Sequence, residues 1–148
     1  MSRKEAAVKT FSKGFNCSQA VLSVFCEESG LDETTALKIA SGFGGGMRKG
    51  EVCGAVTGAI MVLGLKYGHC IEGDTTTKQK ANALTVEFIG KFEDRNRTII
   101  CRNILGYDIS IEEEHKEAAE KGVFSTICPK MIEDVVDILE ETLEREGV

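Results

Sequence analysis

The sequence predicts an all-α fold, a single-domain helical bundle of about six to eight helices around a central apolar helix, over residues 1–148. Apolar residues recur at helical spacing along most of the chain, and no segment shows the apolar–polar alternation of a strand. The chain also contains one proline among its 148 residues. This length, with 42% hydrophobic residues, is typical of one domain with one core.

The first half of the chain predicts four helices, and a glycine directly follows each of the first three. Asn16 is a natural N-cap for the second helix, and Gln19, three residues later, completes a capping box. Asp32 is expected to cap the third helix. The fourth segment is apolar on every side, so it belongs in the centre of the core. The predicted helices of this half span residues 2–13, 17–29, 33–41 and 51–65.

The second half predicts four more helices, some with recognisable starts. Thr98 and Ser110 are typical N-cap residues for two short helices. Pro129, directly after Cys128, suits the first position of the terminal helix, because that position needs no backbone N–H. The predicted helices of this half span residues 81–94, 99–105, 111–122 and 129–143.

Composition and charge disfavour several classes of function. The chain has 18 basic and 24 acidic residues and a formal net charge of −6, which opposes binding to nucleic acid. The longest uncharged stretch, residues 52–65, is too short to span a bilayer as a helix. No apolar signal segment follows Met1, so we expect a cytoplasmic protein whose thiols are reduced.

Four of the six cysteines share a predicted position at the cap or in the first turn of a separate helix. They are Cys17, Cys53, Cys101 and Cys128. First-turn N–H groups lack intrahelical partners and favour an anion, so they should lower the pKa of these thiols. Thiols of low pKa carry out redox chemistry or bind metals. We therefore expect the four to gather near one end of the central helix, as catalytic thiols or as metal ligands.

The spacing of the cysteines leaves their use open. The absence of a Cys-x-x-Cys pair argues against zinc-ribbon and thioredoxin motifs. Converging thiols would form either two dithiol pairs or one four-thiolate site for zinc or an iron–sulfur cluster. Four cysteines that merely pack as small apolar residues are an equally weighted alternative, and a non-catalytic helical interaction module is another. Cys26 is expected to be packing, Cys70 to lie at the surface and His115 to lie on a solvated acidic face.

Small residues mark two places where another group can approach the backbone closely. Residues 42–46 contain four glycines, and the central helix carries glycines and alanines at four-residue spacing. Tight helix packing is the favoured explanation, and contact with a cofactor or partner is the alternative. The candidate cofactor-binding positions are Gly44, Gly45, Gly54 and Gly58.

Three segments of the chain resemble the redox-active protein family C_GCAxxG_C_C: FNCSQAV at residues 15–21, ASGFGGGM at 40–47 and GEVCGAVTGA at 50–59. The resemblance covers essentially the whole chain. It implies a redox role, and the family's four characteristic cysteines fall on the same four positions that capping selects. Members often lie beside transporter genes, which implies a redox or transport-associated protein partner.

The leading hypothesis is reversible thiol chemistry, as in a thiol oxidoreductase. Cys53 or Cys17 would attack a disulfide or an oxidant, and a second cysteine of the set would resolve the mixed species. Spare apolar helix faces leave room for a homodimer, although no sequence feature determines the oligomeric state.

Overall fold

The computed structural model describes residues 1–147. Over those residues it contains helices, turns and an isolated antiparallel bridge between Val52 and Ile100, without a β-strand. The all-α prediction is confirmed. The α-helices are α1 (Arg3–Ser12), α2 (Cys17–Ser23), α3 (Glu33–Ala40), α4 (Gly54–Tyr67), α5 (Thr75–Asn96), α6 (Cys101–Leu105), α7 (Glu112–Glu120) and α8 (Val123–Glu146).

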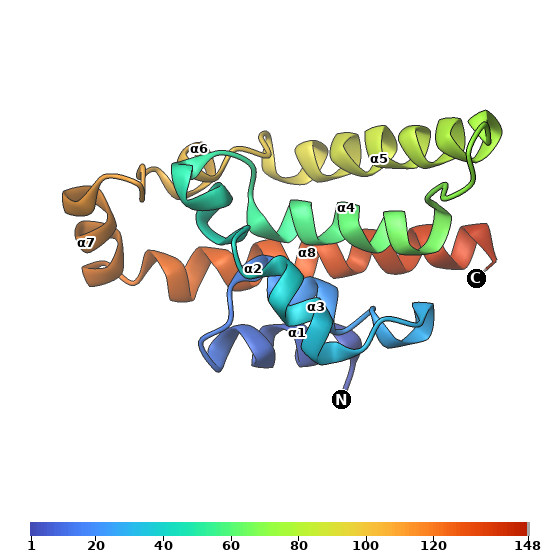
Figure 1. Cartoon of the computed structure of the whole chain (residues 1–148). Coiled ribbons are helices and arrows are strands. Elements are labelled where there is room, and N and C mark those ends of the chain that lie inside the picture. Colours follow the sequence, from blue (N-terminus) through green and yellow to red (C-terminus); the bar gives the residue numbers. More distant parts are fainter. Residues whose placement is uncertain (148) are drawn as a thin grey trace.

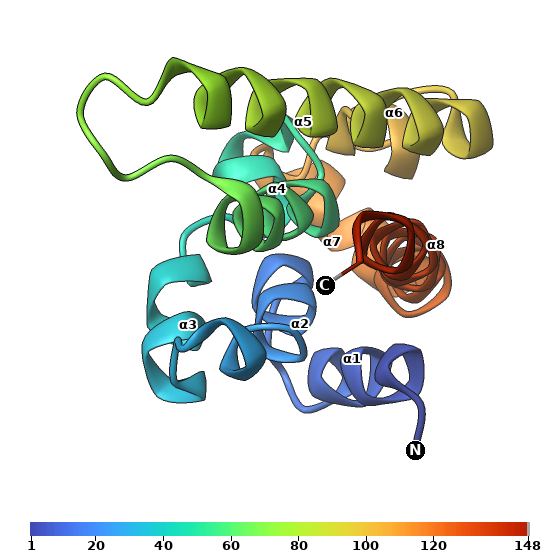
Figure 2. The ribbon, with the colours of Figure 1, turned by 90° about the vertical axis from the view of Figure 1, so that its right-hand side faces the viewer.

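Helix α4 lies in the middle of the bundle. Figure 1 shows α5 on one side of it and α1 to α3 on the other, with α8 running alongside, and the end-on view in Figure 2 agrees. Packing contacts join α4 to α2, α5 and α8. Because most of α4 is buried and apolar, the prediction of a central apolar helix is confirmed. None of the helices within residues 1–147 combines the length and apolar character needed to cross a membrane.

Small residues bring α2 and α4 close together. A Cβ atom placed on Gly58 would lie 2.9 Å from the Ser18 carbonyl oxygen and 3.1 Å from the Cβ of Val21. Gly54 faces α2 as well, with a Cβ there 3.3 Å from the Cβ of Cys17. This close approach determines where Cys17, at the start of α2, lies relative to the start of α4.

Two of the predicted N-caps are confirmed. The Asn16 side chain accepts a hydrogen bond from the Gln19 amide at 2.9 Å, and the Gln19 side chain accepts one from the Asn16 amide at 2.9 Å. Asp32 accepts a hydrogen bond from the Thr35 amide at 3.0 Å at the start of α3. Both caps satisfy amides that have no partner within the helix.

The predicted caps Thr98 and Ser110 are wrong. Thr98 accepts a hydrogen bond from the Ile100 amide at 3.1 Å within a turn, and α6 begins only at Cys101. Ser110 interacts with Asp108, and α7 begins at Glu112 without a side-chain cap. Short polar side chains satisfy turns as readily as helix starts, so their presence alone does not identify a cap.

The predicted start of the terminal helix is also wrong. Gly122 has a φ of 70°, and this turn allows α8 to begin at Val123, immediately after α7. Val123, Phe124 and Ile127 pack against the small buried cluster formed by Cys101, Leu105 and Ile109. This burial stabilises additional helix before Pro129, although the proline lacks the N–H of a helical hydrogen bond. Cys128 therefore lies inside α8 and not at its start.

Candidate functional site

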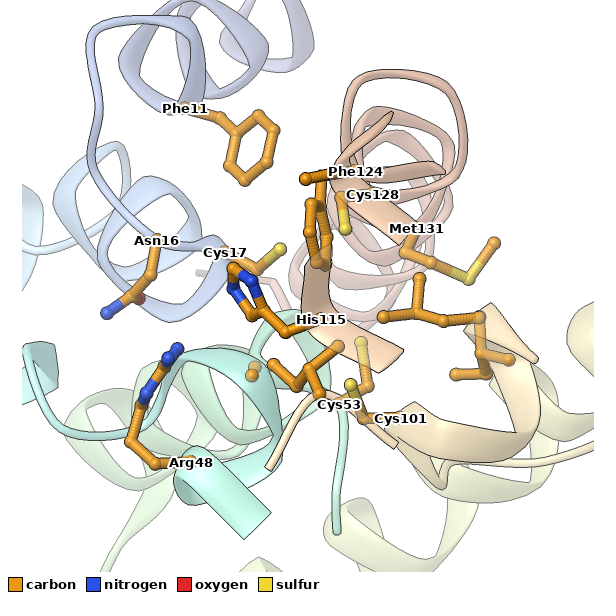
Figure 3. Close-up of a pocket in the computed structure, with 16 residues that line it drawn as sticks. Phe11, Asn16, Cys17, Arg48, Cys53, Cys101, His115, Phe124, Cys128 and Met131 are labelled. Atoms are coloured by element: carbon orange, nitrogen blue, oxygen red, sulfur yellow. The ribbon is translucent and has the colours of Figure 1, made fainter. Parts of the chain in front are cut away.

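A cavity of about 240 Å³ lies at the end of the bundle where α4 begins (Figure 3). The chain segments around it come from α1, α2, α4, α6, α7 and α8 and from the loop before α4. Its wall is mainly apolar and aromatic. The lining residues are Phe11, Asn16, Cys17, Gly45, Arg48, Cys53, Gly54, Cys101, Ile104, Leu105, Ile109, His115, Ala119, Phe124, Cys128 and Met131.

All four cysteines singled out by the sequence line this cavity (Figure 3). Cys17 is the first residue of α2, Cys53 directly precedes α4, and Cys101 is the first residue of α6. Cys128 lies in the sixth position of α8. All four carry free thiols, of which only that of Cys128 is partly exposed. The structure thus brings together four cysteines that are far apart in the sequence.

Cys17 and Cys128 form an interacting pair. The interaction of its side chain with that of Cys17 lowers the pKa of Cys128 below its ordinary value, although burial opposes this shift. The same interaction, together with burial, raises the pKa of Cys17 well above its ordinary value. Because the Cys128 side is more accessible to solvent, the negative charge of the pair belongs on Cys128.

Burial dominates the other two thiols. It raises the pKa of Cys53 to about 11, although the amides of Ala55 and Val56 at the start of α4 act in the opposite direction. Burial, followed by the nearby Cys53 and Cys128, raises the pKa of Cys101 to about 12. The helix-start effect expected from the sequence therefore exists at Cys53, but loss of hydration outweighs it.

The directions of these pKa shifts differ from what the helix positions predicted. The sequence favoured Cys53 or Cys17 as the attacking residue, on the ground that each stands at a helix start. In the structure the pKa is raised for both, and the only one of the four with a lowered pKa is Cys128. The favourable partner of Cys128 is a second thiol and not a helix terminus.

The candidate glycines separate into two groups. Gly45 and Gly54 line the cavity, where the small residue leaves room for neighbouring side chains. Gly44 and Gly58 are not part of the lining; a Cβ on Gly44 would meet the Asn16 side chain, and Gly58 packs against α2. At Gly44 and Gly58, neighbouring atoms lie too close to leave room for a larger side chain, so close packing explains the glycine.

The four cysteines predicted as metal ligands are not arranged around a common point in this structure. Within residues 1–147, no three side chains of His, Cys, Asp or Glu are positioned to share one metal ion. The zinc or iron–sulfur site expected from the sequence remains a prediction, and metal analysis of the protein would test it.

A sequence model of the family described as "Putative redox-active protein (C_GCAxxG_C_C)" matches residues 15–142. The chain belongs to this family. Neither the curated proteins nor the solved structures contain a match to this chain. Membership in the C_GCAxxG_C_C family supports a redox-related role in general terms.

The two cysteines outside the C_GCAxxG_C_C pattern lie away from the cavity lining. Cys26 is fully buried, and its thiol donates a hydrogen bond to the Ser23 carbonyl oxygen at 3.4 Å. Cys70 is exposed. Both placements agree with the packing and surface positions expected from the sequence.

Sequence reasoning missed two polar residues of the cavity, Arg48 and His115. His115 is not on a fully solvated face; its ring lies 5.2 Å from the ring of Phe124. A signal was available, because His115 shares a helical stripe with Ile111 and Ala118. Arg48 enters the site through an unusual backbone turn that no helix or strand pattern predicts.

Proposed function

We propose that this protein is a thiol–disulfide redox protein in which Cys128 is the nucleophile and Cys17 is the resolving thiol. The observation that carries the proposal is the pair itself: two free thiols in one cavity, with the pKa of Cys128 lowered by the thiol of Cys17. A thiolate next to a second thiol is the arrangement that thiol–disulfide exchange requires.

The proposed reaction has two steps. The Cys128 thiolate attacks one sulfur of a substrate disulfide, a bond forms between the two sulfurs, and the other substrate sulfur leaves as a thiolate. Cys17 then releases its proton, and its sulfur attacks Cys128, which expels the second substrate thiolate. The substrate gains two electrons, and the protein retains a Cys17–Cys128 disulfide that an external dithiol would reduce.

Cys53 and Cys101 have a different part in this scheme. With pKa values of about 11 and about 12, both remain protonated at neutral pH. They are therefore poor nucleophiles toward a substrate disulfide, and the first attack is confined to Cys128. They form the wall beside the reacting pair, and the proposed reaction assigns them no bond-making step.

Alkylation across a range of pH tests this assignment. We expect iodoacetamide to modify Cys128 with a pH midpoint below the value of about 8.5 for an ordinary cysteine thiol, as measured by peptide mass spectrometry. Uniform slow labelling of all the cysteines would contradict the proposal. The variants Cys128→Ser and Cys17→Ser should lose net disulfide reduction, whereas the matched control Cys26→Ser should retain it, because Cys26 is buried away from the cavity.

The purified protein and its cysteine variants also test the two other hypotheses, a metal site and a non-catalytic interaction module. Stoichiometric iron or zinc in protein purified without air would support the four-thiolate metal site. Full biological function in both Cys17→Ser and Cys128→Ser would favour the non-catalytic interaction module.

A further inference from the structure

Arg48 reaches the cavity on a left-handed turn of the backbone. Residues 45–48 all have positive φ, with values of 62°, 62°, 59° and 61°, and two of them, Met47 and Arg48, are not glycine. Side chains other than glycine rarely adopt this conformation, and such backbone tends to persist where function requires it. The turn is held by hydrogen bonds from the Met47 amide to Phe43 and from the Glu51 amide to Gly46.

The guanidinium group of Arg48 lies folded over Gly45. A Cβ atom on Gly45 would be 2.8 Å from Nη1 of Arg48 and would also meet Ile109. Glycine at this position therefore serves two purposes, since it permits the positive φ and leaves space for the guanidinium. This backbone conformation places the guanidinium of Arg48 at the cavity.

This cation has no acidic partner within the part of the chain that the structure describes. Arg102, nearby in the fold, pairs with Glu51 at 2.9 Å, but none of the ion pairs found within residues 1–147 involves Arg48. The residues that line the cavity include no Asp or Glu. A chain with a net charge of −6 thus keeps carboxylates off this wall and presents Arg48 there.

Arg48 and the four thiols line the same cavity, and the positive charge of Arg48 acts against burial on the pKa of Cys101. In Figure 3 the Cys17 sulfur lies beside the His115 ring, with Arg48 on the other side of that ring from Cys53 and Cys101. Apolar residues, including Phe124 and Met131, fill much of the remaining wall. A volume of about 240 Å³ admits only a small molecule.

We propose that the cavity accepts one half of a small aromatic disulfide, a single ring that carries a carboxylate, and that Arg48 binds the carboxylate while the disulfide faces Cys128. The inference rests on the proposed function, because it names the substrate class of the same site. The guanidinium suits this role because it binds a carboxylate through two parallel hydrogen bonds. The His115 and Phe124 rings, whose planes are tilted by 42°, supply aromatic faces against which the ring can pack.

Two probes that differ in charge test the proposal. Dithiobis(nitrobenzoate) carries a carboxylate on each ring, and dithiodipyridine is a neutral aromatic disulfide. The rate constant for each would be measured with the full chain, with Arg48→Met and with Lys49→Met. Lys49 is the matched control because it is an exposed neighbouring cation outside the cavity lining.

We expect Arg48→Met to slow the carboxylated probe about tenfold relative to Lys49→Met, while the neutral probe changes by less than about twofold. The neutral probe corrects for any change in thiol reactivity, and the control corrects for the loss of one positive charge. Equal slowing of both probes, or equal effects of the two variants, would overturn the inference.

A binding measurement distinguishes failure of this inference from failure of the proposed function. If neither probe reacts at Cys128 in the unmodified protein, the proposed function fails. Calorimetric titration with the thionitrobenzoate anion then decides the binding inference by itself. Binding that Arg48→Met weakens and Lys49→Met leaves unchanged supports the carboxylate site, and binding that is absent, or unaffected by Arg48→Met, overturns it.

Discussion

Two glycines of α4 provide a matched test of the helix packing that positions the thiols. Gly58 faces α2, where a Cβ would lie 2.9 Å from the Ser18 carbonyl oxygen and 3.1 Å from the Cβ of Val21. Gly64, in the same helix, is open, because a Cβ placed there would have no neighbouring atom within 4 Å. The substitutions Gly58→Ala and Gly64→Ala therefore add the same methyl group to a crowded position and to an open one.

The expected difference follows from two opposing contributions. Alanine in place of glycine favours a helix by about 1 kcal/mol at either position. At Gly58 the methyl group must also push α2 away, and overpacking of this kind costs about 1–3 kcal/mol. Gly64→Ala should therefore raise the free energy of unfolding by about 1 kcal/mol, and Gly58→Ala should lie about 1–3 kcal/mol below it.

Urea denaturation followed by circular dichroism measures both changes, and alkylation measures the consequence for the site. Because Ser18 is adjacent to Cys17, movement of α2 should weaken the contact between Cys17 and Cys128. The alkylation midpoint of Cys128 should then rise in Gly58→Ala and stay unchanged in Gly64→Ala. Equal unfolding free energies for the two variants, within about 0.5 kcal/mol, would refute the packing argument.

Three further predictions concern stability. The Cys53 pKa of about 11 lies above the value of about 8.5 for an unfolded thiol, so stability from this group is complete below about pH 8 and declines as the pH rises. At about pH 10 the loss of unfolding free energy should be about 2 kcal/mol smaller in Cys53→Ala than in the unmodified protein, because Cys17 and Cys101, whose pKa values are also raised, still contribute their own losses; equal losses in the two proteins would contradict this. Met47→Gly should raise the free energy of unfolding by about 0.5–1 kcal/mol because Met47 has a φ of 59°, whereas a decrease would show that the turn is not strained. Asn16→Ala should cost about 1–2 kcal/mol in chemical denaturation and more than Asp32→Ala, because the Asn16 side-chain amide also donates to the distant Ser41 carbonyl at 3.1 Å, whereas both hydrogen bonds of the Asp32 carboxylate are to Thr35. Equal losses would contradict this difference.

Residues close together in the sequence account for what could be predicted of the fold. The Asn16 capping box, the Asp32 cap and the apolar character of α4 each depend on neighbours within a few positions, so periodicity and residue type reveal them. The same local reasoning selected the four cysteines that line the cavity. It failed at the start of α8, because burial of Phe124 and Ile127 against α6 stabilises helix before Pro129.

The chemistry of the site depends on contacts between helices that are distant in the sequence. Position at a helix start predicted a lowered pKa for Cys53, but burial raises it, since the loss of hydration exceeds the effect of two backbone amides. Cys128 has a lowered pKa because α2 brings Cys17 beside it.

Residue order alone was enough to predict an all-α chain that resembles the C_GCAxxG_C_C family, because helix periodicity and short motifs are local properties. The three-dimensional packing was needed to find that Cys17 lies beside Cys128 and that Arg48 lines the same cavity. Desolvation and thiol pairing arise where separate helices meet, and no local pattern encodes them.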